Sequence, residues 1–186
     1  SVSDEALMLI ASKGIKWVAT DEDILFESLA MRDKKTGAPD RKELYKPYRF
    51  EKGAKPLNMI FRDKNISNII SFNYNEWDQQ KAAWDLIEHF KNIDSSLKDK
   101  AKRSLAAIVM DGENAWEFYE DNGRKFFETF YANLDKQDGL YSTTITDYLE
   151  SEEAGAPAIH RIFPGSWIFH NFEIWIGQDQ DNESWD

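Results

Sequence analysis

A short apolar run that ends abruptly in acidic residues constrains this chain more than any other segment. The run spans residues 106–110, and Asp111, Gly112, Glu113 and Trp116 follow it. A run of about five apolar residues is typical of one buried strand of a parallel sheet. In α/β folds, polar groups just beyond the carboxyl end of such a strand commonly build a site. The segment therefore predicts a strand with a candidate site at its end.

The same residues also fit a purely structural role. Asp and Asn are good helix caps, and Asp-Gly is common in turns. A strand end followed by a helix cap would explain Asp111 and Asn114 without any chemistry. Two acids and a tryptophan after so apolar a run suit a site equally well, so both interpretations stay open on the residues alone.

Two earlier apolar segments, at residues 15–18 and 57–61, end in a similar way. The charged residues that follow them are Asp21, Glu22, Arg62 and Asp63. Acids at these positions could cap a following helix, and an adjacent Arg-Asp pair could form a structural ion pair. In a β/α barrel, however, successive strand ends converge on one mouth. These residues are therefore candidates for the same site.

Helical patterns alternate with the predicted strands. Apolar residues recur at helical spacing over residues 4–13, 77–90 and 126–134, and a shorter helix is predicted at 144–149. Residues 33–55 are charged and punctuated by Gly and Pro, which predicts a loop. Alternating strands and helices indicate an α/β fold with parallel strands.

Composition limits the partners and cofactors of the chain. With 23 basic and 34 acidic residues, the net charge is −11, which argues against nucleic acid and against anionic membranes as partners. The chain has no cysteine, which excludes thiolate metal sites and is compatible with a cytoplasmic location. His160 and His170 lack a third ligand at suitable spacing, so no metal and no other cofactor is expected. Carboxylates and many aromatic rings without a basic patch suit a carbohydrate substrate.

Four segments together resemble glycoside hydrolase family 57. Residues 110–117, with the sequence Met-Asp-Gly-Glu-Asn-Ala-Trp-Glu, and the Tyr, Asn-Gly and Phe-Phe residues after them are similar to the family's fourth conserved region. Residues 14–25, 61–67 and 165–177 resemble other regions of the family in the same order along the chain. Agreement in order over nearly the whole chain is far more specific than any one motif.

The resemblance implies part of an incomplete (β/α)7 barrel with parallel strands, in which residues 1–186 form a single domain. It also implies a retaining mechanism on the α-glucosidic bonds of an α-glucan or maltooligosaccharide. Asp111 occupies the position of the family's general acid/base. The residues that would line the substrate-binding mouth are Asp21, Glu22, Arg62, Asp63, Glu113, Trp116 and Trp167.

The family's glutamate nucleophile belongs upstream of the segment that residues 1–5 resemble. We therefore expect this chain to be an internal piece of a larger catalytic domain, such as that of an amylase or amylopullulanase, and to be inactive alone. A cut barrel would expose strand edges and favour self-association. Two alternatives remain: a non-catalytic or vestigial glucan-binding fragment, in which Trp116, Trp167 and Trp175 stack on sugars, and a structural domain whose acids are only caps.

Overall fold

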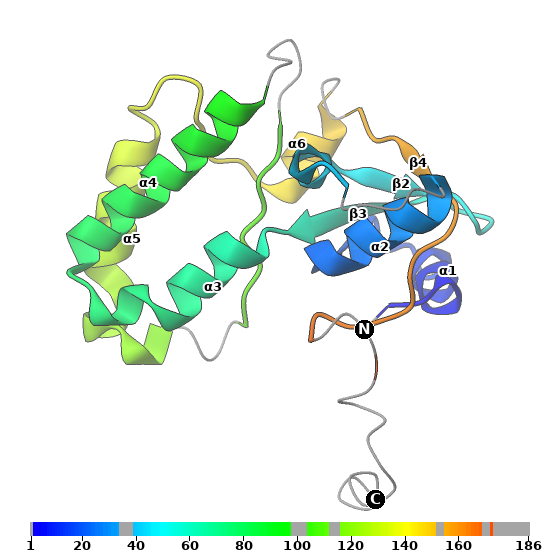
Figure 1. The fold of residues 1–186 in the computed structure, drawn as a ribbon, viewed down its shortest axis with the longest axis horizontal. Helices are drawn as coiled ribbons and strands as arrows, with labels where there is room; N and C mark the ends of the chain where they lie inside the picture. Colours follow the sequence, from blue (N-terminus) through cyan, green and yellow to red (C-terminus); the bar gives the residue numbers. More distant parts are fainter. Residues whose placement is uncertain are drawn as a thin grey trace, which may run out of the picture. The chain divides into compact units, whose positions relative to one another are not determined.

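The computed structural model describes residues 2–33, 39–97, 104–111, 116–151, 155–168 and 172. The chain divides into two compact units (Figure 1). The first, called the sheet unit here, comprises Ser1–Arg62 and Gly155–Asp186. The second, called the helical unit, comprises Asp63–Ala154.

The sheet unit combines helices with one four-stranded sheet. Its elements are α1 (Asp4–Ser12), β1 (Trp17–Asp21), α2 (Glu22–Asp33), the 3-10 helix η1 (Arg41–Tyr45), β2 (Tyr48–Phe50), β3 (Leu57–Arg62) and β4 (Ala158–Ile159). The strand order is β1-β3-β2-β4. β1 pairs with β3 in parallel, β2 with β3 antiparallel, and β2 with β4 in parallel. The parallel pairing of the strands at 15–18 and 57–61, which the sequence predicts, is thereby confirmed.

β3 forms the apolar centre of the sheet. All its side chains except that of Asn58 are buried, as expected for a strand covered on both faces. Tyr48 and Phe50 of β2 are also buried, and the Tyr48 ring meets that of Phe61 edge-on at 5.8 Å between centroids. The prediction of a loop at 33–55 is therefore wrong in part. β2 is only three residues long and pairs with a partner distant in sequence, so no local periodicity reveals it.

The helical unit is built around two long helices. Its elements are α3 (Lys64–Phe72), η2 (Tyr74–Glu76), α4 (Gln79–Ser96), η3 (Trp116–Phe118), η4 (Glu120–Gly123), α5 (Arg124–Leu134) and α6 (Ile145–Glu150). α4 and α5 lie side by side (Figure 1). The helices predicted at 4–13, 77–90, 126–134 and 144–149 are confirmed, with α4 extending further toward its C-terminus than the pattern indicates.

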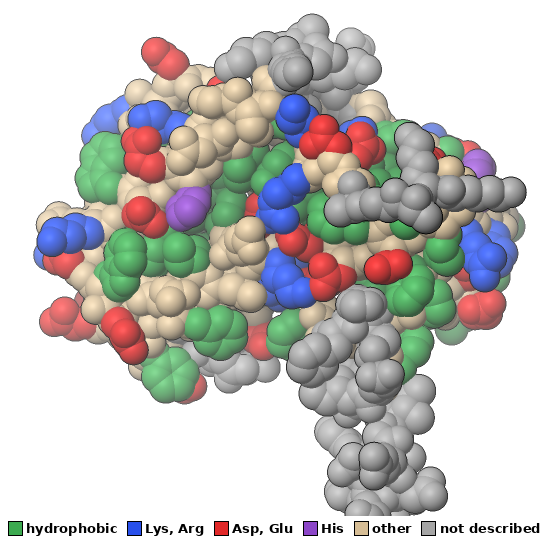
Figure 2. Space-filling model, viewed as in Figure 1, with side chains coloured by type: hydrophobic (Ala, Val, Ile, Leu, Met, Phe, Trp, Pro, Cys, Tyr) green, Lys and Arg blue, Asp and Glu red, His purple; other side chains and the backbone are tan. Residues whose placement is uncertain are grey.

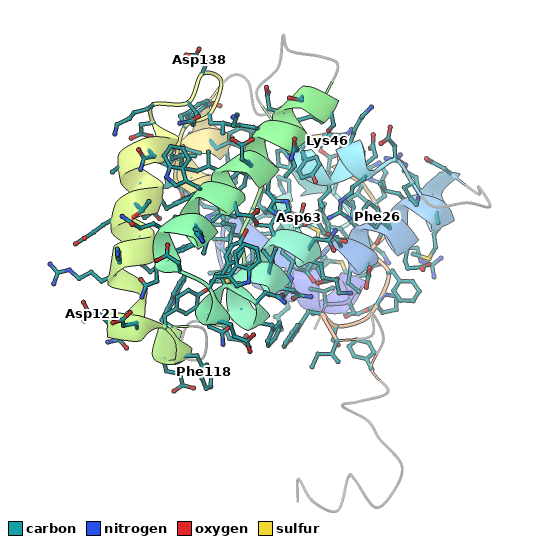
Figure 3. The ribbon with its side chains drawn as sticks, turned by 60° about the vertical axis from the view of Figure 1, so that its left-hand side comes forward. Phe26, Lys46, Asp63, Phe118, Asp121 and Asp138 are labelled. Carbon is teal, nitrogen blue, oxygen red and sulfur yellow. The ribbon has the colours of Figure 1, made fainter. Side chains whose placement is uncertain are left out.

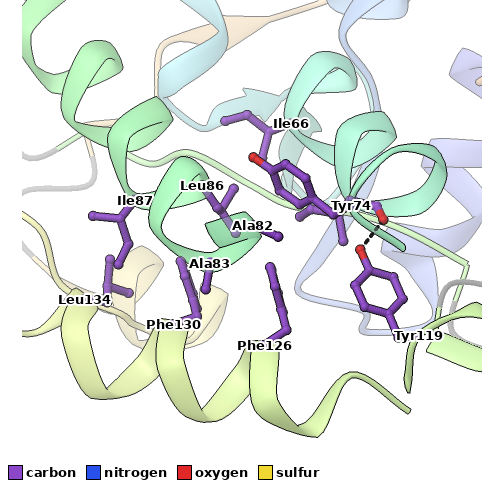
Figure 4. Packing of buried hydrophobic residues seen from close by; sticks show 11 residues of the cluster. Ile66, Tyr74, Ala82, Ala83, Leu86, Ile87, Tyr119, Phe126, Phe130 and Leu134 are labelled. Atoms are coloured by element: carbon purple, nitrogen blue, oxygen red, sulfur yellow. Dashed lines mark hydrogen bonds between the residues drawn. The ribbon is translucent and has the colours of Figure 1, made fainter. Parts of the chain in front are cut away.

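An apolar core joins α3, α4 and α5. Phe126, Phe130 and Leu134 project from successive turns of α5 toward the face of α4 that carries Ala82 and Ala83 (Figure 4). This spacing of three or four residues places the side chains on one helical face. The other buried members of the core are Ile66, Ile70, Tyr74, Leu86, Ile87 and Tyr119. Tyr131, which the sequence pattern places on the same stripe, is instead exposed.

The strand predicted at 106–110 is not one of the four strands of the sheet. Within the described residues 104–111, Ala107 alone forms a β-bridge, and its carbonyl accepts the Asp63 N–H at 3.1 Å. The pairing goes no further because the chain turns into α3 directly after Asp63. Residues 106–110 are half-buried rather than fully buried. The apolar run therefore forms an extended segment with a single bridge.

Charges of both signs lie close together on the protein surface. Figure 2 shows acidic, basic and apolar side chains interspersed over the face in view. None of the helices in the described part of the chain combines the length and the apolar character that a bilayer crossing requires.

Candidate active site

Asp111 lies at the exposed end of the extended segment, within the helical unit. Backbone groups upstream of it are tied to α3 and its cap. The Val109 N–H donates to the buried Ser67 hydroxyl at 3.3 Å, in addition to the contact between Asp63 and Ala107. Asp111 is thus an exposed residue at the end of an anchored stretch of backbone. Glu113, the second acid of the motif, lies outside the described residues.

Trp116 is half-buried and packs among other aromatic rings. Its ring centroid lies 4.3 Å from that of Phe127, 5.0 Å from Tyr119 and 5.8 Å from Phe126. Gly123 makes this packing possible, because a Cβ atom there would lie 2.8 Å from Cε3 of Trp116. The ring therefore contributes to the core of the helical unit, and direct contact with a sugar stays a prediction.

Asp63 has a clear structural role at the start of α3 (Figure 3). Its buried carboxylate accepts hydrogen bonds from the N–H groups of Asn65 and Ile66 at 3.0 and 3.2 Å. These N–H groups belong to the first turn of the helix, which has no carbonyl partners for them. Asp63 is thus the N-cap of α3, as the capping interpretation predicts.

In the sheet unit, the structure brings together Asp21, Arg62 and Trp167. Asp21 and Arg62 are register partners at the ends of β1 and β3, and Nε of Arg62 lies 3.2 Å from Oδ2 of Asp21. Asp21 is fully buried, and its other oxygen accepts the Asp23 N–H at 3.1 Å. The Arg62 guanidinium lies 5.4 Å from the ring centre of Trp167, which suits a cation–π contact.

The exposure of Trp167 distinguishes it from the other two members of this group. It is 39% exposed, whereas Asp21 and Arg62 are buried. An indole ring that is held by a cation and still exposed can offer apolar surface to a ligand. Among the predicted substrate-binding residues of the sheet unit, Trp167 has the geometry that best suits contact with a sugar ring.

Glu22 pairs with a residue that the sequence interpretation missed. Both carboxylate oxygens of Glu22 accept hydrogen bonds from Arg41 in η1, at 2.9 and 3.1 Å. The bidentate geometry is the strong form of an arginine–carboxylate interaction. In the sequence, Arg41 is one arginine within a charged segment, and no local pattern specifies Glu22 as its partner.

Tyr119 is a second residue that sequence reasoning did not assign to the site. It is buried next to Trp116, and its hydroxyl donates to the Ile70 carbonyl of α3 (Figure 4). Burial raises the pKa of Tyr119 above its usual value, which already lies well above neutral pH.

The described residues contain no group of three or more His, Cys, Asp or Glu side chains that could hold a metal ion. His160 is exposed, and His170 and Trp175 lie outside the described part of the chain.

Comparison with known proteins identifies similarity to one enzyme family. Residues 1–158 match glycosyl hydrolase family 57. No curated protein matches the chain. Among solved structures, the chain is similar to a 4-alpha-glucanotransferase from Thermococcus litoralis, with a TM-score of 0.62 and 18% sequence identity over 89% of this chain and 23% of that one.

Two branching enzymes of the GH57 type have a similar fold. For that of Pyrococcus horikoshii, the TM-score is 0.68 at 10% identity, covering 92% of this chain and 36% of that one. For that of Thermococcus kodakaraensis, solved in complex with glucose, it is 0.65 at 10% identity, covering 90% and 38%. The chain thus spans less than two fifths of each solved relative. These likenesses confirm the α/β class and agree with part of a (β/α)7 barrel.

Proposed function

Because this chain belongs to glycosyl hydrolase family 57, we propose that it supplies the general acid/base of a retaining enzyme that cleaves or transfers α-glucans. The observation that carries the proposal is the placement of Asp111. It is an exposed carboxylate at the end of an anchored segment, in the motif that resembles the acid/base region of the family. The solved relatives are a glucanotransferase and branching enzymes, which supports an α-glucan substrate.

In this proposal, the carboxyl group of Asp111 donates its proton to the glycosidic oxygen as the bond to the leaving sugar breaks. The resulting carboxylate then removes a proton from the incoming water or sugar hydroxyl. A second carboxylate acts as the nucleophile.

Trp167 is the proposed sugar-stacking residue, and Arg62 supports its ring. Substrate contact through Asp21, Glu22, Asp63, Glu113 and Trp116 stays a prediction. Asp21, Glu22 and Asp63 already interact with other groups of the protein, which favours supporting roles for them. A single catalytic domain over residues 1–186, self-association and a cytoplasmic location likewise remain predictions.

A non-catalytic glucan-binding role is the second candidate. The exposed ring of Trp167 favours it, because stacking on a sugar requires no acid. Under this alternative, maltooligosaccharides quench the fluorescence of Trp167 while the full-length protein cleaves nothing.

The substitution Asp111→Asn in the full-length protein tests the proposal. Turnover of maltooligosaccharides should fall by about 10²–10⁴-fold, the usual contribution of general acid–base catalysis. The unfolding midpoint should not change, because Asp111 is exposed. Asp138→Asn, at another exposed aspartate (Figure 3), is the matched control and should retain wild-type turnover. Unchanged turnover in Asp111→Asn would contradict the proposal.

A further inference from the structure

One helix, α3, holds the chain on both sides of Asp111. On the upstream side, the Ser67 hydroxyl accepts the Val109 N–H at 3.3 Å. On the downstream side, the Ile70 carbonyl accepts the hydroxyl of Tyr119. Ser67 and Ile70 are three residues apart and therefore lie on the same face of α3.

Burial makes both contacts specific. Ser67 is 1% exposed, Ile70 1% and Tyr119 4%. Buried polar groups are costly without a hydrogen-bond partner, so these pairs strongly favour one arrangement of the chain. The Ile70 carbonyl is also among the last four of α3, which have no regular intrahelical donor. Tyr119 therefore completes the end of the helix while fixing its own position.

Further contacts secure the downstream side. Gln79, at the start of α4, donates to the Glu120 carbonyl at 2.7 Å and accepts the Phe126 N–H at 2.9 Å. Between these two points, Asp121 and Asn122 adopt left-handed conformations with φ of 49° and 51° (Figure 3 labels Asp121). Residues other than glycine rarely adopt such values, and the surrounding contacts must maintain them.

From these contacts we infer that Ser67 and Tyr119 are positioning residues, which hold the backbone on either side of Asp111 so that its carboxyl group is placed for proton transfer. The inference rests on the proposed function, since it assumes that Asp111 is the acid/base. On this inference α3, which carries no predicted catalytic residue, determines how efficiently Asp111 transfers its proton.

The chemistry explains why placement matters. Proton transfer to a leaving oxygen requires the donor within hydrogen-bonding distance, and small displacements of a catalytic group reduce rates sharply. A leaving group that departs without protonation is insensitive to such a displacement. Fluoride in α-maltotriosyl fluoride needs much less acid assistance than the sugar alkoxide of a maltooligosaccharide. The two substrates therefore separate a misplaced acid from a general loss of folded enzyme.

The test is Tyr119→Phe in the full-length protein. This variant loses the bond to Ile70 and keeps the ring that packs against Trp116 and Phe126. We expect kcat/KM to fall about tenfold on maltooligosaccharides and less than about threefold on α-maltotriosyl fluoride. Tyr131→Phe removes an exposed hydroxyl from α5 and should change neither value.

Equal losses on the two substrates, or no loss on either, would overturn the inference, because a merely structural contact affects both reactions alike. Ser67→Ala, which removes the upstream contact, is measured in the same way, so that a test remains if one variant does not fold. Asp111→Asn distinguishes a failure of the proposed function from a failure of the positioning role alone. If Asp111→Asn keeps full activity, the proposed function fails. If Asp111→Asn is inactive on maltooligosaccharides while Tyr119→Phe shows no substrate dependence, only the positioning role fails.

Discussion

In the sheet unit, the acids at the strand ends are buried and paired with arginines, Asp21 with Arg62 and Glu22 with Arg41. In the helical unit, Asp111 is exposed, and the chain around it is held by aromatic packing and backbone hydrogen bonds. A carboxylate held in a buried ion pair is fixed by its partner, whereas an exposed carboxylate is accessible to a ligand. The comparison teaches that acids after similar apolar runs can be either buried in ion pairs or left exposed to solvent, and that the apolar run alone does not decide between the two.

The largest stability effect that the comparison predicts is at Asp21. Asp21→Asn keeps an oxygen for the Asp23 N–H and removes the charge that faces the buried Arg62. Breaking a buried ion pair by removing one of its two charges should lower the free energy of unfolding by about 3–5 kcal/mol. Denaturant unfolding of the full-length protein measures this change.

Glu51→Gln is the matched control for that experiment. It breaks the Arg49–Glu51 ion pair, whose side chains are 50% and 38% exposed, and should cost less than about 1 kcal/mol. Similar small losses in both variants would show that the charges at the strand ends do not fix the structure of the sheet unit, and the contrast between the units would disappear.

A smaller effect is expected from a pair of glycine substitutions, one in each unit. Gly123 in the helical unit and Gly14 in the sheet unit both have positive φ, 75° and 82°. A Cβ at Gly123 would clash with Trp116, whereas nothing lies within 4 Å of a Cβ at Gly14. Gly14→Ala should therefore cost about 1 kcal/mol from backbone strain alone.

Gly123→Ala should cost about 2–3 kcal/mol, because the clash adds to the same strain. Thermal unfolding of both variants measures the difference. Equal costs would mean that Trp116 moves away easily and that the aromatic packing does not hold the downstream side of the Asp111 region.

The local pattern of apolar residues was sufficient to predict the long helices and two of the strands. α4 and α5 follow from apolar residues at helical spacing, and β1 and β3 from short apolar runs before charged residues. β2 and β4 were missed because three- and two-residue strands depend on pairing with distant segments. The run at 106–110 was wrongly predicted as a strand of the sheet, since apolar composition alone does not reveal where pairing ends.

The site was predictable only as a set of candidate residues. Acids after apolar runs identified Asp21, Asp63 and Asp111 as candidates, but whether each is paired, capping or exposed depends on its neighbours in space. The partners Arg41 and Tyr119 come from segments whose contacts reach 19 and 49 residues along the chain. No local spacing in the sequence could have indicated them.

The most direct test of the account is azide rescue of Asp111→Ala in the full-length protein, with α-maltotriosyl fluoride as substrate. Without its base, the enzyme should form the glycosyl intermediate and hydrolyse it slowly, and azide should replace the activated water. The account predicts faster turnover with azide and an α-configured glycosyl azide, because two inversions retain configuration. A β-configured azide would identify Asp111 as the nucleophile instead. If Asp111→Ala turns over as fast as the wild type and azide has no effect, Asp111 takes no part in the chemistry.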